Sequence, residues 1–212
     1  MSRRSTPASR AEVRERRAAL TDVGAVMDAA ARFLEARPRS VAETRRRLTH
    51  AGYPPPLVEE VLGRLAELGY LDDGAFARAW VESRDRAHPR GEAALRRELT
   101  LKGLDRDVVD AVLEERRASG DGQRLPGSQR ATGTAPASGG DSAEATPDPD
   151  ELAARRVLDQ RAAVLLREPD PRRRRAKAYA LLARHGFDPG TCRAVTEAWL
   201  TGVTPGEDFE DV

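Results

Sequence analysis

The chain has 212 residues and a formal net charge of +1; 33% of the residues are charged and 4% are aromatic. A single cysteine excludes an intramolecular disulfide, and the lack of a long apolar run argues against a membrane-spanning helix. This composition predicts a helix-rich protein with small hydrophobic cores, and we expect it in the cytoplasm.

The first third of the chain predicts a basic arm followed by a unit of three helices. Residues 1–21 are rich in arginine and lack the apolar stretch of a secretory signal, so we expect a disordered arm. Residues 22–70 show helical spacing of apolar residues in three segments. The second segment begins at Ser40, with Glu43 three residues later in the pattern of a capping box, and it ends at Gly52.

Two further units of three helices are predicted in the rest of the chain. The second unit covers residues 71–117, and the third covers residues 150–202. Between them, residues 118–149 are dense in Gly, Ser, Thr, Pro and Asp, so we expect a disordered linker there. Residues 203–212 form an acidic tail.

The three units share one pattern, which is anchored on a glycine after the middle helix. Gly52 and Gly103 lie 51 residues apart, whereas Gly103 and Gly186 lie 83 apart, and the excess matches the linker. The equivalent apolar positions are Leu48, Leu99 and Leu182 before the glycine, Tyr53, Leu104 and Phe187 directly after it, and Val61, Val112 and Val195 beyond. The sequence therefore predicts an all-α fold, an elongated array of three tandem three-helix repeats.

Enzyme chemistry is not expected. The chain lacks a glycine-rich phosphate loop and the HExxH, CxxC and GxSxG motifs. Its three histidines are scattered, and Cys192 aligns with the apolar Val58 and Val109, so we interpret it as a core residue. We predict no catalytic residues, no metal site and no cofactor.

The aromatic residues have two readings, as core residues or as a platform for nucleotide bases. They are Phe33, Phe76, Trp80, Tyr179 and Trp199. All five follow the helical spacing of core positions, so we favour packing over base stacking.

Clusters of arginine recur in the middle helix, or at its entry, in each unit. They comprise Arg45–Arg47, Arg96–Arg97 and Arg172–Arg175. One interpretation is a solvated helix face with ion pairs to nearby acids. The other is a functional basic stripe, which we favour because tandem repeats present equivalent positions along one surface.

Several segments resemble the RecX family, bacterial regulators of the RecA recombinase. The resemblance extends from about Arg32 to Glu115 and is weaker from Arg172 to Thr201. Its most specific residues are Leu71-Asp72-Asp73, Phe76-Ala77, Trp80 and Arg84, followed by the helix end from Leu99 to Gly103. In the first unit, Thr44 stands where the family usually has an apolar residue, which suggests a looser packing there.

The resemblance implies a modulator, mainly an inhibitor, that binds the RecA–single-stranded DNA filament. It would limit filament growth, ATP hydrolysis, strand exchange and coprotease activity, and so regulate DNA repair and the SOS response, as a monomer without a membrane partner. The candidate contact residues are Arg45, Arg46, Arg84, Arg96, Arg97, Arg172, Arg173, Arg174 and Arg175. The alternatives are a three-helix DNA-binding protein that acts without RecA, and a helical scaffold for another partner. The near-neutral net charge disfavours a dedicated DNA binder.

Overall fold

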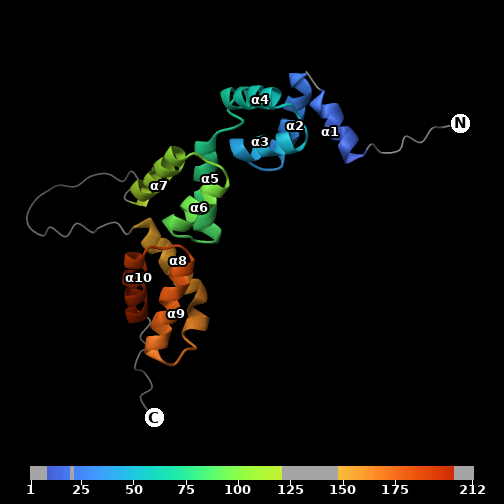
Figure 1. Cartoon of the computed structure of the whole chain (residues 1–212). Coiled ribbons are helices and arrows are strands. Elements are labelled where there is room, and N and C mark those ends of the chain that lie inside the picture. The colour runs from blue at the N-terminus through green and yellow to red at the C-terminus, as the bar shows by residue number, and fades with distance from the viewer. Residues whose placement is uncertain (1–8, 20–21, 121–147, 203–212) are drawn as a thin grey trace, which may run out of the picture. The chain divides into compact units, whose positions relative to one another are not determined.

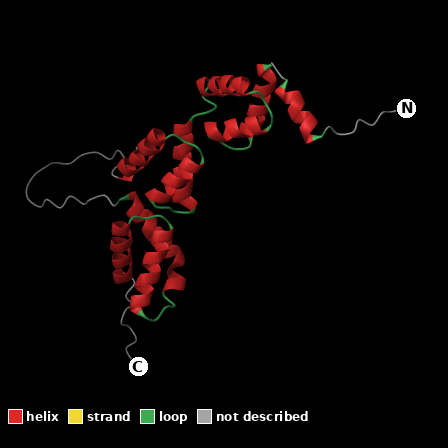
Figure 2. Ribbon diagram, in the orientation of Figure 1, coloured by secondary structure: helices red, strands yellow, loops and turns green. Residues whose placement is uncertain are grey.

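The computed structural model describes residues 9–19, 22–120 and 148–202, which form helices and turns without a strand (Figure 1). The helices are α1 (Arg10–Ala18), α2 (Val23–Glu35), α3 (Val41–His50), α4 (Pro55–Glu67), α5 (Asp73–Ala87), α6 (Glu92–Leu101), α7 (Arg106–Gly120), α8 (Pro149–Leu165), α9 (Pro171–Arg184) and α10 (Pro189–Gly202). Figure 2 shows the same helices by type of structure. The all-α prediction is confirmed, with α2–α4, α5–α7 and α8–α10 as the three repeats.

The described helices form two compact units. The first contains the described residues up to Trp80 together with Arg97–Val109, and the second contains Val81–Arg96 and the described residues from Asp110 onward. The division falls within α5, α6 and α7, so each helix of the second repeat contributes to both units. The predicted acidic tail and most of the predicted linker lie outside the described residues, with α7 reaching Gly120 and α8 beginning at Pro149.

The first repeat packs α2, α3 and α4 around a small apolar core. Its buried residues are Val26, Ala30, Leu48, Tyr53, Val58, Val61, Leu62, Leu65 and Leu71. Thr44 is fully buried on α3, and its hydroxyl donates a 3.0 Å hydrogen bond to the carbonyl oxygen of Ser40. A polar residue is tolerated at this core position because its one donor is satisfied within the helix.

The third repeat has its own core between α8, α9 and α10, which run side by side in Figure 1. This core contains Leu158, Leu182, Phe187 and the fully buried Cys192, whose predicted core position is confirmed. Trp199 is also buried there, and its indole nitrogen donates a 2.8 Å hydrogen bond to the carboxylate of Asp159 on α8. The bond gives the one polar atom of this side chain a partner.

The anchor glycines end α3, α6 and α9 with the same backbone geometry. Gly52, Gly103 and Gly186 have φ angles of 95°, 84° and 85°, a left-handed conformation that glycine adopts without steric cost. In each case the next residue donates its backbone N–H to the leucine carbonyl four residues before the glycine: Tyr53 to Leu48, Leu104 to Leu99, and Phe187 to Leu182. The leucine and the apolar residue are both buried, as in a Schellman helix ending. This motif explains the repeated Leu–Gly–apolar pattern of the sequence.

Within the first unit, the start of α3 meets the end of α6. The hydroxyl of Ser40 donates a 2.7 Å hydrogen bond to the carbonyl oxygen of Lys102, and the backbone N–H of Val41 donates to Asp73 at 2.9 Å. Burial raises the pKa of Asp73, and the bond from Val41 partly offsets that effect. The carboxylate of α5 and the last turn of α6 therefore both bind the first turn of α3.

The second unit repeats this arrangement one step along the array. The backbone N–H of Gly91 donates to the carbonyl oxygen of His185 at 3.1 Å, and that of Glu92 donates to Asp150 at 3.0 Å. Counted from the anchor glycines, Gly91 and Glu92 are the equivalents of Ser40 and Val41. Equivalent residues thus join consecutive repeats at both junctions.

The basic arm predicted as disordered contains a helix, α1. Ser9 and Glu12 form a capping box in which each side chain accepts a hydrogen bond from the backbone N–H of the other. Arg17 on α1 donates a 3.2 Å hydrogen bond to the carbonyl oxygen of Ala51, beside Gly52. The prediction of a disordered arm over residues 1–21 is therefore wrong for α1, because its capping residues and its contact with α3 stabilise a helix there.

Candidate functional site

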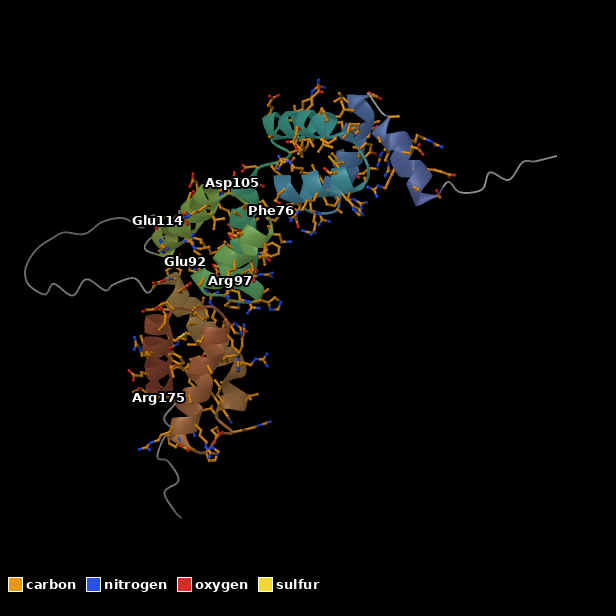
Figure 3. All side chains as sticks on the ribbon, in the orientation of Figure 1. Phe76, Glu92, Arg97, Asp105, Glu114 and Arg175 are labelled. Atoms are coloured by element: carbon orange, nitrogen blue, oxygen red, sulfur yellow. The ribbon has the colours of Figure 1, made fainter. Side chains whose placement is uncertain are left out.

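The predicted contact arginines are divided between the two units. Arg45, Arg46 and Arg97 belong to the first unit, and Arg84, Arg96 and Arg172–Arg175 belong to the second. Figure 3 shows Arg97 on α6 and Arg175 on α9.

On α3, the two predicted residues have different partners. Arg45 forms a bidentate ion pair with Glu59 on α4, with N–O distances of 2.7 and 2.9 Å. Arg46 is exposed and donates a 3.2 Å hydrogen bond to the carbonyl oxygen of Lys102. The ion pair lowers the pKa of Glu59, so this carboxylate keeps its charge and neutralises Arg45. Arg46 retains its positive charge without an ion pair to a described residue.

On α6, Arg96 is part of an ion-pair cluster. Its guanidinium lies 3.1 Å from the carboxylate of Glu92, and it also pairs with Asp110 on α7. Arg117 pairs with the same Glu92 at 2.6 Å. Burial acts to raise the pKa of Glu92, but the two arginines outweigh it and the pKa is lowered. Arg96 is therefore fixed by ion pairs within the fold. This agrees with the interpretation of the arginine clusters as helix faces that pair with nearby acids.

The four arginines of α9 lie in its first turn. Arg173 lies 3.6 Å from Asp170, Arg175 lies 3.4 Å from Glu197, and Arg174 donates to the carbonyl oxygen of Glu168 at 2.9 and 3.0 Å. Arg45 and Arg96 lie seven residues before their anchor glycines, whereas Arg172–Arg175 lie 14 to 11 residues before Gly186, so the α9 cluster does not occupy the equivalent position. The expected recurrence at matching positions holds for two repeats and fails for the third.

The first unit contains a basic groove between α1 and α3. Of the nine predicted contact arginines, Arg45 and Arg46 line it. Eight residues line it, and we call this set the α1–α3 groove: Arg14, Phe33, Glu43, Arg45, Arg46, Arg47, Thr49 and His50. Arg14 comes from α1 and Phe33 from α2, while the other six belong to α3. The guanidinium of Arg47 lies 5.8 Å from the centre of the Phe33 ring, and that of Arg39 lies 4.4 Å from it.

The predicted aromatic residues lie mainly in helix packing. Phe76 is buried and stacks on Trp80 with ring centres 6.0 Å apart. The indole nitrogen of Trp80 donates to Glu98 at 2.9 Å, and the ammonium of Lys102 lies 4.6 Å from its ring centre. Packing is therefore the confirmed reading for Phe76 and Trp199. Phe33 differs, because it is half-buried beside two guanidinium groups at the groove.

The sequence holds one signal that would have revealed Arg14. Residues 9–18 read SRAEVRERRA, and residues 40–49 read SVAETRRRLT. Serine, alanine, glutamate and two arginines coincide, with Arg14 in the place of Arg45. A comparison of the arm with the middle helices would have predicted α1 and its basic face.

Other kinds of site are not found in the described part of the chain. No group of three or more His, Cys, Asp or Glu side chains is arranged to hold a metal ion among residues 9–19, 22–120 and 148–202. Within the same ranges, no helix is long and apolar enough to cross a membrane.

Two family models match consecutive segments of this chain. The model of the first three-helix domain of RecX matches residues 27–65, and the model of the second three-helix domain matches residues 72–113. These segments correspond to the repeats α2–α4 and α5–α7.

Curated relatives with the name Regulatory protein RecX match the same part of the sequence. The protein of Mycobacterium avium (strain 104) is 48% identical over 83 residues, which are 39% of this chain and 47% of that protein. The protein of Mycolicibacterium smegmatis is 40% identical over 93 residues, which are 44% of this chain and 50% of that protein. The chain thus spans about half the length of the curated relatives it matches.

Solved structures share the fold over a larger part of the chain. A crystal structure of regulatory protein RecX has a TM-score of 0.62 at 16% identity, covering 91% of this chain and 80% of that chain. The RecX of Lactobacillus salivarius has a TM-score of 0.59 at 13% identity, covering 84% and 97%. The consecutive domain matches, the curated relatives and this common fold agree, and the chain belongs to the RecX family.

Proposed function

We propose that this protein modulates the RecA recombinase by binding the RecA–single-stranded DNA filament. It acts mainly as an inhibitor, which limits filament growth, ATP hydrolysis, strand exchange and coprotease activity and so regulates DNA repair and the SOS response. It does this in the cytoplasm as a monomer and without catalysing a reaction of its own. The observation that carries the proposal is the match of two consecutive three-helix domains to those of RecX regulatory proteins.

The repeated architecture supports a polymeric partner. Hydrogen bonds from equivalent residues join the start of α3 to the end of α6, through the hydroxyl of Ser40, and the start of α6 to the end of α9, through the backbone N–H of Gly91. Repeats joined in the same way present related surfaces, and a helical filament presents its own surfaces at regular intervals. Several weak contacts on one chain then act together, because each bound repeat raises the effective concentration of the next.

The proposal is tested by the ATPase activity of RecA on single-stranded DNA, with this protein added below stoichiometric amounts. Inhibition well below one molecule for each RecA is expected, because a modulator of filament growth acts on many protomers at once. An unchanged ATPase rate at equimolar protein, with the helical circular dichroism spectrum intact, would contradict the proposal. Binding to DNA without any effect on RecA would instead favour an independent DNA-binding protein.

Some of the predicted contact arginines form ion pairs within the fold, so their substitution affects stability as well as RecA binding. An Arg96→Glu change would place a third carboxylate beside Glu92 and Asp110, so lost inhibition could reflect a disturbed helix packing. Arg97→Glu tests the neighbouring exposed position on the same helix. We expect this variant to inhibit RecA less strongly, with circular dichroism and the melting temperature as controls for its folding. Full inhibition by Arg97→Glu would remove Arg97 from the contact surface.

A further inference from the structure

The α1–α3 groove combines a helix outside the matched family domains with the middle helix of the first repeat. The family models match residues 27–65 and 72–113, so neither match includes α1. We propose that α1 and α3 together bind the phosphate backbone of single-stranded nucleic acid in this groove. The inference deepens the proposed function and rests on it for the partner, since it names the part of a RecA–DNA filament that this groove contacts.

The contact of α1 with α3 resembles the contacts between repeats. Ser9 and Glu12 cap α1 as Ser40 and Glu43 cap α3, with a capping box in both helices. The backbone of Arg14 would lie 3.1 Å from a Cβ atom at Gly52. At the two repeat junctions, the equivalent Gly103 and Gly186 also face a middle helix of the preceding repeat, at Ala42 and Ala94. α1 therefore occupies the place of a preceding middle helix.

This position brings the basic side chains of two helices to one groove. Four arginines and one glutamate line it, and Arg45 is neutralised by Glu59. The glutamate, Glu43, is already held by Lys102 at 2.9 Å. Arg14, Arg46 and Arg47 are exposed and form no ion pair with a described residue. Like charges that converge without a counter-charge repel one another, so binding of a polyanion relieves this repulsion.

The lining favours a nucleic acid over a protein partner. Protein interfaces usually owe their affinity to buried aromatic or aliphatic anchors in well-packed pockets. The groove offers one apolar side chain, Phe33, which is half-buried beside the guanidinium groups of Arg39 and Arg47. Nucleic acid supplies regularly spaced phosphates, and arginine binds phosphate through a planar pair of N–H donors. Surfaces that bind nucleic acid are correspondingly more polar and more positive.

The experiment measures binding of fluorescently labelled oligo(dT) to the full chain, without RecA, by anisotropy at several salt concentrations. The test variant carries Arg14→Gln and Arg47→Gln. The matched control carries Arg161→Gln and Arg193→Gln, two exposed arginines of the second unit outside the groove. Labelled poly-glutamate serves as an acidic polypeptide probe. Circular dichroism and melting temperature verify that all variants are folded.

We expect the test variant to bind oligo(dT) about tenfold more weakly at low salt, whereas the control binds as the parent does. The slope of log affinity against log salt should also become shallower by about 1.4, roughly 0.7 for each lost phosphate contact with a single strand. Affinity that is unchanged in the test variant, or equally reduced in both variants, overturns the inference. Tighter binding of poly-glutamate than of oligo(dT), lost in the test variant, also overturns it and assigns the groove to an acidic protein.

These outcomes are distinguishable from failure of the proposed function. A parent protein that inhibits RecA but does not bind oligo(dT) contradicts the groove inference alone. A parent protein that binds oligo(dT) through Arg14 and Arg47 but leaves the RecA ATPase unchanged contradicts the proposed function alone.

Discussion

The backbone nitrogen of Gly91 donates a 3.1 Å hydrogen bond to the carbonyl oxygen of His185, 94 residues later in the chain. The two backbones approach so closely that a Cβ atom at Gly91 would lie 2.3 Å from the carbonyl oxygen of Gly186. The equivalent residue in the first repeat is Ser40, which instead uses its hydroxyl to bind the end of α6. One junction is therefore made by backbone contact and the other by a side chain.

The first prediction concerns Gly91→Ala. A methyl group at this position must push back the backbone that follows α9, so we expect a loss of about 1–3 kcal/mol in the free energy of unfolding. Urea unfolding followed by circular dichroism measures this loss. The control is Gly63→Ala in α4, where an added Cβ meets nothing within 4 Å. The control should be more stable by up to about 1 kcal/mol, since alanine favours a helix over glycine. Equal effects at both positions would refute the close approach.

The second prediction compares the two serine caps. Ser40→Ala removes the N-cap of α3 and the 2.7 Å hydrogen bond to Lys102, so it should cost about 1–2 kcal/mol. Ser9→Ala removes only the N-cap of α1, so it should lower the helical signal with a change in global stability of less than about 0.5 kcal/mol. Urea midpoints and the circular dichroism signal at 222 nm measure both effects. If Ser9→Ala proved the more destabilising variant, the assignment of Ser40 to the repeat junction would be wrong.

The third prediction concerns Arg116, which lies between two carboxylates and is 8% exposed in its side chain. It binds both oxygens of Asp85 at 2.9 and 3.0 Å, and one oxygen of Asp150 at 2.6 Å. Arg116→Met leaves these carboxylates without their cation, so we expect a loss of about 3–5 kcal/mol in unfolding free energy at pH 7. The neighbouring Arg117→Met removes a partly exposed pair and leaves Glu92 with Arg96 as a partner, so it should cost less than about 1 kcal/mol.

The pH dependence of Arg116→Met provides a second readout for the same network. Burial already raises the pKa of Asp150 above its ordinary value, and the loss of Arg116 raises it further. A carboxyl whose pKa is higher in the folded state binds more protons there, so its contribution to stability improves as the pH falls. The difference between Arg116→Met and the parent should therefore narrow from pH 7 toward pH 4. A constant difference would show that Asp150 is not the group left unpaired.

The fourth prediction uses Asp188, the residue before α10. Its carboxylate accepts hydrogen bonds from the hydroxyl and N–H of Thr191 and from the N–H of Gly190, which lower its pKa. A lowered pKa gives stability that is present above the ordinary pKa of aspartate and is lost as the pH falls through the folded value. Asp188→Ala should therefore cost about 1 kcal/mol at pH 7 and less below about pH 4. Thermal unfolding at both pH values measures this; a loss that grows on acidification would contradict it.

Most of the fold could be predicted from the sequence, because the local signals for helix starts and ends agree with the repeat pattern. The capping box at Ser40 and the glycine at Gly52 mark the two ends of α3, and both signals depend on a few neighbouring residues. The helix α1 was missed because its apolar face is nearly absent. Such a segment looks disordered by composition, and what distinguishes it is its likeness to the start of α3 and its contact with α3.

The candidate site was harder to predict, because the sequence does not show which acidic side chain pairs with which arginine. Arg45, Arg46 and Arg47 are consecutive and chemically identical, yet Arg45 is neutralised by a glutamate 14 residues later. Arg47 lies instead beside Phe33 in the groove. Which arginine keeps an available charge depends on how the helices pack, and that is a property of the tertiary structure.

The position of α1 on Gly52 also has a consequence for the assembly of separate molecules. A junction in which the end of one repeat binds the start of another is a head-to-tail contact, and such contacts grow into open-ended fibres when they do not close. α1 covers the end of α3 at the anchor glycine, which is the surface that meets a middle helix at the two repeat junctions. Because it covers that surface, we expect α1 to disfavour head-to-tail assembly of separate chains.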